Sequence, residues 1–344
     1  MIASPPSLGR RRLLQLGLGA SALLALPAGL TGCRQGQAED LLMVAGELPQ
    51  AWWRRLPAPW RGRSLDSPDA VLEQLQTSSR APGGPGLVSL ADGWATSVPS
   101  SRWQPLQAPD LLGRLANWAE PISRLFRPAD GPALAFPWAF SPWVLVLRSR
   151  PSLAARAQEG WDLLLDPSLT GKLVLPSSPR LCIELMGRDF DRIAALRRQA
   201  LAYDDRDGLS LLLSGEAEAA VLPLRRLIPL LRRDQRLQVV LPASGAPLSW
   251  QLLLRPTGAS APLPLDWIAA ALEPPLLAVL LQAGWVPPLS RAALEPQVRR
   301  FPDPLAALLL PDQQVLERCW SLPPLTVPQR LALQTVWDAS GLPD

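Results

Sequence analysis

The side chains that could do chemistry in this 344-residue chain are mainly carboxylates, arginines and tryptophans. Histidine is absent, which excludes a Ser–His–Asp triad, a Cys–His pair and histidine-ligated zinc or haem. Gly171–Lys172 lacks the earlier glycine and the following Ser or Thr of a phosphate loop. Tyr203 is the only tyrosine, which argues against a ferric site of paired tyrosines. A carboxylate enzyme stays open, but no pattern indicates one, and no cofactor or metal is predicted.

The net charge of +4 does not indicate a nucleic-acid partner. Arg10, Arg11 and Arg12 lie in a leader without acids, and removing them leaves +1, with both signs scattered along the chain. Phosphate binding needs a concentrated basic face, which the sequence does not contain. The pairs Arg225–Arg226 and Arg232–Arg233 lie among leucines and are interpreted first as helix surface.

The first 33 residues have the order of an export signal. Arg10 to Arg12 precede an apolar run from Leu13 to Leu26, which small residues follow. This run is short and glycine-rich for a membrane-spanning helix. Arg10–Leu14 resembles the twin-arginine export motif, and Leu30–Cys33 resembles the bacterial lipobox, which implies acylation of Cys33 and a periplasmic, membrane-anchored protein. A plain signal peptide, an uncleaved anchor and the general secretory route remain alternatives. Cys182 and Cys319 either form a disulfide or remain two thiols.

Apolar runs predict an α/β chain. Strands are expected near residues 41–45, 87–90, 143–147, 173–175, 219–222, 237–241 and 250–254. Helices are expected near residues 68–76, 111–118, 122–126, 161–164, 193–201 and 327–339. The apolar stretch Leu263–Leu289 contains Asp266, Glu273 and the pair Pro274–Pro275, so it is interpreted as two core-packed helices rather than a membrane span.

The order of these segments resembles the bacterial spermidine/putrescine-type solute-binding proteins of ATP-driven importers. The run Trp161–Pro167, continuing through Gly171–Lys172 to Ser178-Pro179-Arg180, is similar to the start of that family's second lobe. Further segments match in the same order: Leu87–Trp94, Ala135–Val146, Ser214–Ala217, Leu248–Trp250 and Ala283–Pro287.

The resemblance implies a two-lobed type 2 periplasmic binding fold, in which two α/β lobes hold a ligand in a cleft between them. The two lobes would be joined by crossing strands near Leu145–Ser149 and Trp250–Leu254. The implied organisation is an export signal (1–33), a first lobe in two parts (39–146 and 251–300), a second lobe (147–250) and bracing C-terminal helices (301–344). The implied function is that of a monomeric receptor that hands a small solute to a membrane permease and its ATPase.

The resemblance also implies a set of ligand-binding candidates. They are Glu47, Asp92, Trp94, Trp138, Ser178, Arg180 and Trp250. Each also has a structural interpretation: core packing for the tryptophans, an ion pair for Arg180, and helix or turn caps for Glu47 and Asp92.

The polyamine signature of the family is largely missing. A polyamine site needs carboxylates and aromatic faces. The family's acids fall at Ser178, Leu181 and Leu252, and the tryptophan of its second lobe falls at Pro223. Two of its first-lobe tyrosines fall at Leu48 and Gly93. Three hypotheses follow: a polyamine bound through other acids, a polar or anionic metabolite bound by Arg180 with Arg225 as a second candidate, or a lipoprotein scaffold without transport.

Overall fold

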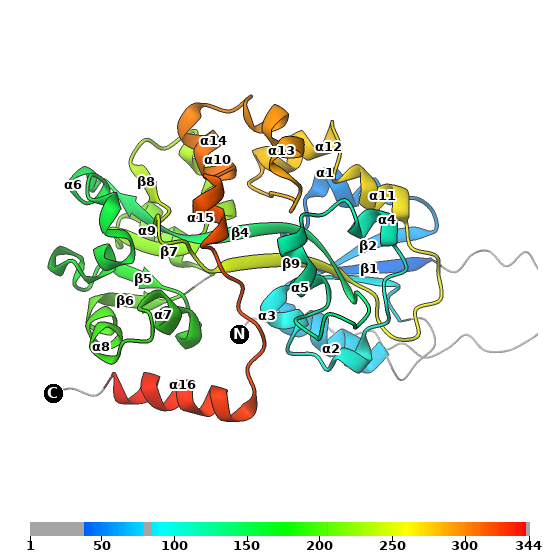
Figure 1. Cartoon of the computed structure of the whole chain (residues 1–344), viewed down its shortest axis with the longest axis horizontal. Coiled ribbons are helices and arrows are strands. Elements are labelled where there is room, and N and C mark those ends of the chain that lie inside the picture. The colour runs from blue at the N-terminus through cyan, green and yellow to red at the C-terminus, as the bar shows by residue number, and fades with distance from the viewer. Residues whose placement is uncertain (1–37, 79–83, 205, 342–344) are drawn as a thin grey trace, which may run out of the picture. The chain divides into compact units, whose positions relative to one another are not determined.

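One nine-stranded mixed sheet organises the chain (Figure 1), in the order β2-β1-β3-β9-β4-β7-β5-β6 with β8 paired to β4. The computed structural model describes residues 38–78, 84–204 and 206–341, so the predicted leader and Cys33 lie outside the described residues. The strands are β1 Glu39–Val44, β2 Trp60–Leu65, β3 Leu87–Ala91, β4 Ala135–Arg148, β5 Leu173–Leu175, β6 Ala200–Tyr203, β7 Ala219–Pro223, β8 Leu237–Val240 and β9 Leu248–Leu254.

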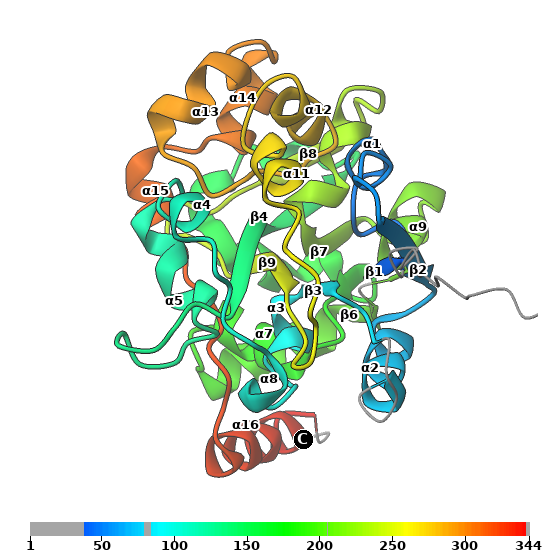
Figure 2. The same ribbon diagram turned by 90° about the vertical axis from the view of Figure 1, so that its right-hand side faces the viewer.

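Short helices surround this sheet. The α-helices are α1 Gln50–Trp53, α2 Pro68–Ser78, α3 Asp92–Ala95, α4 Pro109–Leu112, α5 Glu120–Ser123, α6 Pro151–Ala154, α7 Pro179–Leu185, α8 Phe190–Gln199, α9 Gly208–Ser214, α10 Ile228–Leu231, α11 Leu265–Ala270, α12 Leu276–Gln282, α13 Arg291–Val298, α14 Asp303–Leu309, α15 Gln313–Glu317 and α16 Val327–Ala339. The 3-10 helices are η1 Ser100–Arg102, η2 Asn117–Ala119, η3 Ala157–Leu165, η4 Pro167–Leu169 and η5 Leu224–Arg226. In Figures 1 and 2, α12, α13 and α14 lie on the opposite side of the sheet from α2 and α16.

Strand β4 divides the sheet into two lobes. Its residues Ala135–Pro142 pair with β9, whereas Trp143–Leu147 pair with β7 and Leu145–Arg148 pair with β8. We call the part around β1, β2, β3, β9 and the start of β4 the first lobe, and the part around β5 to β8 and the end of β4 the second lobe. The predicted two-lobed α/β architecture is confirmed.

Both crossings lie earlier in the chain than predicted. Strand β4 changes partners between Pro142 and Trp143, not near Leu145–Ser149. Strand β9 already pairs with β3 and β4 over the predicted crossing Trp250–Leu254. The chain therefore returns to the first lobe before Leu248. The apolar pattern of the sequence continues through both crossings. Hydrophobicity therefore does not indicate where a strand changes partners.

Two hydrophobic clusters form the core. The larger cluster contains the fully buried rings of Trp52, Trp138 and Trp250. Trp52 stacks on Trp267 with ring centroids 4.5 Å apart, and Trp138 lies 4.8 Å from Trp285. The smaller cluster lies in the second lobe and includes side chains of α7 and α8. Burial of aromatic side chains is among the largest apolar contributions that a residue can make to stability.

The stretch Leu263–Leu289 forms the two predicted core-packed helices, α11 and α12. Between Leu276 and Leu281, four of the leucines of α12 are buried in the larger cluster. In residues 38–78, 84–204 and 206–341, no helix combines the length and apolar character needed to cross a membrane.

The C-terminal segment links the start of β9 to the second lobe. The Trp320 N–H donates to the Ala246 carbonyl oxygen at 3.1 Å, and the Leu248 N–H donates to the Trp320 carbonyl oxygen at 2.8 Å. The predicted helix at 327–339 is α16, which begins at a capping box formed by Thr326 and Gln329. Figure 1 shows α16 beneath α7 and α8, and α16 contacts α7.

Candidate functional site between the lobes

The predicted charged residues follow the carboxyl ends of strands in both lobes. Glu47 follows β1 and Asp92 follows β3 in the first lobe, whereas Arg180 follows β5 and Arg225 follows β7 in the second. Ligands of open α/β sheets bind outside the carboxyl ends of strands, so this is the expected place for a binding site.

Asp92 is the first residue of α3 and lies against β9. Its carboxylate accepts a hydrogen bond from the Trp250 N–H at 3.2 Å. The residue as a whole is half-buried, but its carboxyl group is enclosed by protein atoms. This loss of hydration raises the pKa of Asp92 to about 6, although the backbone N–H groups of Trp250 and Gly93 and the charge of Arg180 act in the opposite direction. Trp94, two residues along α3, is 36% exposed.

Ser178 and Arg180 form the start of α7 in the second lobe. The Ser178 hydroxyl caps the helix by accepting from the Leu181 N–H at 3.4 Å. Arg180 is half-buried, and burial lowers the pKa of its guanidinium. Within the described residues, its Nε has no hydrogen-bond partner and its guanidinium is in no ion pair. Asp92 and Arg180 thus come from opposite lobes and influence each other's charge without a direct bond.

Glu47 and Arg225 make a direct bond between the lobes. Gly46, with φ +79, forms the turn after β1 that brings Glu47 to this position. The Arg225 Nη2 donates to Oε1 and Oε2 of Glu47 at 2.9 and 2.7 Å, and the Gln251 Nε2 donates to Oε2 at 3.1 Å. The Arg225 guanidinium lies 4.4 Å from the centroid of the Trp285 ring.

The interpretation of Arg225 as helix surface was wrong. Its side chain is only 16% exposed because it lies between Glu47 and the Trp285 ring. This contact was not predictable from the sequence, since Glu47 and Arg225 are 178 residues apart. Gln251 and Trp285 were also missed, although Trp285 lies in a turn, Ala283–Pro287, that matched the family pattern.

The rings of Trp138 and Trp250 lie in the core of the first lobe. Both rings have no exposed surface and pack in the larger cluster. The Trp250 Nε1 donates to the Ser321 hydroxyl at 2.9 Å, whereas the Trp138 Nε1 has no partner in the part of the chain that the structure describes. Leu181 and Leu252, which stand where the resembled family has acids, are buried as well. Of the predicted residues, Trp94 and Ser178 are exposed, and Glu47, Asp92 and Arg180 are half-buried.

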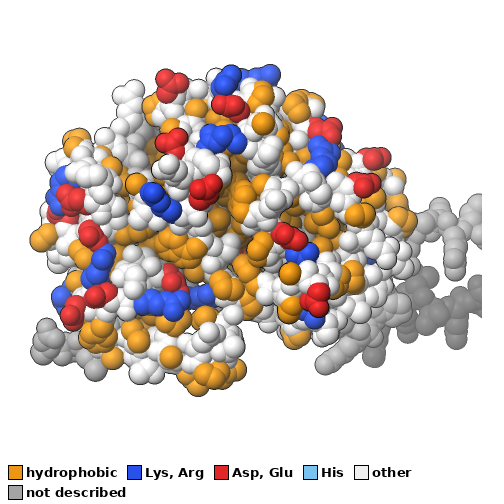
Figure 3. Space-filling view, in the orientation of Figure 1, with side chains coloured by type: hydrophobic (Ala, Val, Ile, Leu, Met, Phe, Trp, Pro, Cys, Tyr) orange, Lys and Arg blue, Asp and Glu red, His pale blue; other side chains and the backbone are white. Residues whose placement is uncertain are grey.

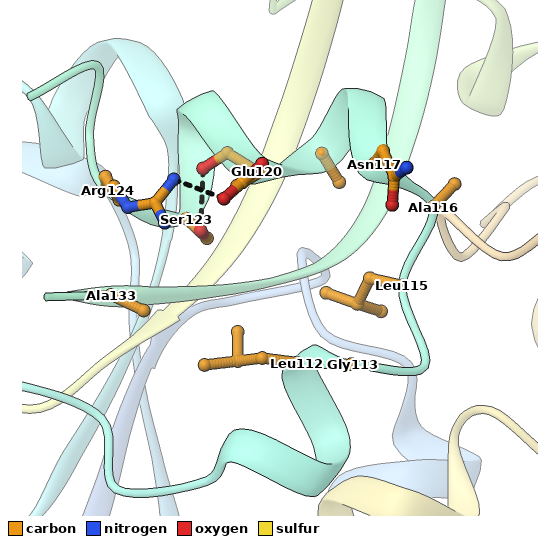
Figure 4. A pocket seen from close by; sticks show the side chains of 10 residues that line it. Leu112, Gly113, Leu115, Ala116, Asn117, Glu120, Ser123, Arg124 and Ala133 are labelled. Carbon is orange, nitrogen blue, oxygen red and sulfur yellow. Dashed lines mark hydrogen bonds and ion pairs between the residues drawn. The ribbon is translucent and has the colours of Figure 1, made fainter. Parts of the chain in front are cut away.

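A separate cavity of about 310 Å³ lies within the first lobe (Figure 4). Residues 112–133 line it, and none of the predicted ligand-binding residues is among them. Its charged groups already pair with each other, since Arg124 bonds Glu120 at 2.7 Å. The Ser123 hydroxyl donates to the Glu120 carbonyl oxygen at 2.7 Å. This cavity therefore offers a solute fewer open polar groups than the residues between the lobes.

Cys182 and Cys319 are not joined by a disulfide. Cys182 lies in the buried side of α7, and its thiol donates to the Pro176 carbonyl oxygen. Burial raises the pKa of Cys319. Of the two alternatives, the two thiols are the one observed.

The surface charge is mixed on the face shown in Figure 3. Hydrophobic side chains gather across the middle of this face, with acidic and basic side chains interspersed around them. This face has no continuous basic patch of the kind that binds a phosphate backbone.

Solved structures share this fold. No model of a known protein family matches the sequence, and no curated protein matches it. The spermidine/putrescine substrate-binding protein PotD of Streptococcus pneumoniae, in complex with calcium and HEPES, superposes with a TM-score of 0.69 at 12% identity, over 88% of this chain and 98% of that one. The TpPotD lipoprotein of Treponema pallidum gives 0.60 at 12% identity, over 88% and 99%. A GABA receptor gives 0.61 at 15% identity, over 88% and 97%.

These likenesses cover nearly the whole of each similar protein at low sequence identity, so they bear on the fold. The chain has the fold of the spermidine/putrescine-type solute-binding proteins.

Proposed function

We propose that the protein is a solute-binding receptor that holds a small polar solute between its lobes and delivers it to a membrane permease and its ATPase. The observation that carries this proposal is Arg180. Arg180 is half-buried, its Nε has no hydrogen-bond partner within the described residues, and its charge interacts with Glu184 of its own helix and with Asp92 of the first lobe. A buried donor without a partner is costly, and a solute that accepts from it removes that cost.

The charges favour an anionic or zwitterionic solute over a polyamine. A carboxylate or similar oxyanion would accept from Arg180, and the cationic end of a zwitterion would lie toward Asp92. A polyamine would require several open carboxylates, but Glu47 is already bonded to Arg225. Only Asp92 is left among the predicted acids, and enclosure disfavours its charged form. Structures named for spermidine/putrescine and for GABA share the fold, which supports both ligand classes equally.

A calorimetric panel tests this proposal. Purified protein is titrated with amino-acid-like zwitterions, small dicarboxylates, spermidine and putrescine. We expect one of the first two classes to bind and Arg180→Ala to weaken that binding about 10–100-fold, the usual effect of losing a hydrogen bond to a charged group. Arg192→Ala is the matched control, because Arg192 lies on the next helix, α8, and pairs with Asp162 rather than with a residue of α7.

Sub-micromolar binding of spermidine, or equal binding by wild type and Arg180→Ala, would contradict the proposed site. Absence of binding throughout the panel would favour the lipoprotein scaffold instead.

We further propose that the protein works outside the cytoplasm, held to a membrane by acylated Cys33, as a monomeric binding protein rather than an enzyme. The basic cluster, apolar run and Leu30-Thr31-Gly32-Cys33 sequence support the export and the anchor. The mixed surface charge supports a solute, not a nucleic acid, as the partner.

A further inference from the structure

A cation-binding site between the lobes is occupied by a side chain of the protein itself. We propose that the Arg225 guanidinium fills a site formed by Glu47, Gln251 and Trp285, which keeps free cations out and ties the second lobe to the first at this point. The inference concerns the same interlobe region as the proposed function, but it does not require the transported solute to be known.

The chemistry of the three surrounding groups is that of a cation site. A carboxylate neutralises the charge, an indole face attracts a cation through its quadrupole, and an amide holds the carboxylate in place. All three are present: the Glu47 oxygens lie 2.7 and 2.9 Å from Arg225 Nη2, and Gln251 donates to Glu47 at 3.1 Å. The Trp285 ring centroid lies 4.4 Å from the guanidinium.

All three surrounding groups belong to the first lobe or to the helices packed on it, whereas Arg225 belongs to the second lobe. Glu47 follows β1 and Gln251 lies in β9. The Trp285 ring packs against Trp138 of β4 in the larger hydrophobic cluster. Arg225 follows β7, which pairs with β5 and with the end of β4. The cation and its site are therefore contributed by different lobes.

The backbone of Arg225 is fixed independently of its side chain. Its N–H donates to the Ser141 hydroxyl on β4 at 2.9 Å. Gly284 has φ +84, and a Cβ there would lie 2.4 Å from the Arg225 carbonyl oxygen. Only glycine at position 284 allows these two backbone segments to approach this closely. Because the backbone is held, the guanidinium remains near Glu47 at a high effective concentration, and a free cation must compete with a tethered one.

The arrangement explains a difference between the two interlobe carboxylates. Glu47 has a permanent cation, so its charge is satisfied before a solute arrives. Asp92 has no ion pair within the described residues and interacts with Arg180 only at longer range. Arg225 thus acts as a specificity-determining residue, since it leaves Asp92 and Arg180 as the interlobe acid and arginine that have no ion pair within the described residues.

Removal of Arg225 should expose the site to a small cation. The full-length Arg225→Ala protein is measured by thermal unfolding and calorimetry with methylguanidinium chloride, with methylurea and sodium chloride as neutral and ionic-strength controls. We expect Arg225→Ala to unfold at a lower temperature than wild type and to be restabilised by methylguanidinium, while wild type shows no such response. We expect Glu47→Gln in the Arg225→Ala background to weaken methylguanidinium binding at least about tenfold.

Arg226→Ala is the matched control, because Arg226 is adjacent but donates to the Arg206 carbonyl oxygen. It should gain no response to methylguanidinium. Equal responses from wild type and Arg225→Ala, or binding that survives Glu47→Gln, would overturn the proposal. Neither outcome bears on solute binding at Arg180, so the two proposals can fail separately.

A second measurement applies if Arg225→Ala does not fold. Nitrogen-15 NMR of the arginine side chains in wild type should show a slowly rotating guanidinium for Arg225, and Glu47→Gln should speed up that rotation. An Arg225 resonance that Glu47→Gln does not change would overturn the proposal.

Discussion

Residues of the same chemistry behave differently between the lobes because their surroundings differ. Glu47 and Asp92 both follow first-lobe strands, and Arg225 and Arg180 both follow second-lobe strands. Glu47 and Arg225 form an ion pair at 2.7 Å, whereas Asp92 and Arg180 do not form one. The Glu47–Arg225 pair contributes a contact between the lobes, whereas Asp92 and Arg180 keep hydrogen-bonding groups for the proposed solute.

The enclosed carboxylate of Asp92 predicts a specific pH dependence. Its folded pKa, about 6, lies above the ordinary value of 3.8, so its protonated form stabilises the fold. This stabilisation of the fold is complete at pH values below 3.8 and is lost as the pH rises through about 6. Asp92→Asn keeps an oxygen for the Trp250 N–H and removes the charge. It should therefore raise the free energy of unfolding near pH 8 by about 1–3 kcal/mol.

Denaturant unfolding of both proteins between about pH 4 and pH 8 is the measurement. The advantage of Asp92→Asn should shrink as the pH falls, and Asp66→Asn, at an exposed position, should show no such trend. If the free energy of unfolding changed with pH in the same way for wild type and Asp92→Asn, burial would not destabilise the charged form of Asp92.

The positions of residues were predictable where they depend on the strand that precedes them. Asp92 and Arg180 follow strands that an apolar run and a following turn make visible, and both lie between the lobes. Trp138 and Trp250 were not separable from core residues, because an indole suits a binding site and a core equally well. Arg225 was misplaced because its partners, Glu47 and Trp285, come from distant parts of the sequence.

At the scale of elements, local signals predicted the helix with the clearest capping residues, whereas long-range strand pairings were not predictable. The predicted helix at 327–339 matches α16, since Thr326, Pro328 and Gln329 mark its start within a few residues. Strand β2 was missed because Trp60–Leu65 alternates weakly and lies at the edge of the sheet. The change of partners within β4 depends on β7 and β9, which lie more than 70 residues away.

Helix α16 should depend on Trp337 for its position on the second lobe. The Trp337 ring stacks under the Arg197 guanidinium at 4.3 Å and meets Tyr203 edge-on at 5.6 Å. Trp337→Ala should cost about 1–3 kcal/mol of unfolding free energy and speed amide exchange throughout α16.

The matched control lies on the same helix. Leu331 is 62% exposed, so Leu331→Ala should change stability by less than about 0.5 kcal/mol. Hydrogen-exchange mass spectrometry of the peptide covering α16 distinguishes the two variants. Equal exchange in both would mean that Trp337 does not hold the helix.

At the scale of the whole molecule, the proposed receptor role depends on export of the chain and on movement of its two lobes. The proposed anchor is tested by Cys33→Ser, which removes the acylated thiol from the Leu30-Thr31-Gly32-Cys33 sequence. We expect the variant to accumulate as an unprocessed or released form, because methylene burial in the membrane holds the acylated protein. Fractionation and intact mass measure this, and unchanged processing and membrane retention in Cys33→Ser would contradict the anchor.

Strand β4 and the segment that enters β9 before Leu248 connect the lobes, and we propose that the lobes rotate about these connections. Small-angle X-ray scattering of the purified protein, with and without the solute that calorimetry identifies, tests the account most directly. We predict that saturating solute decreases the radius of gyration, and that Arg180→Ala at the same solute concentration shows a smaller decrease. A radius of gyration that saturating solute leaves unchanged in wild type would contradict a receptor whose lobes close on its ligand.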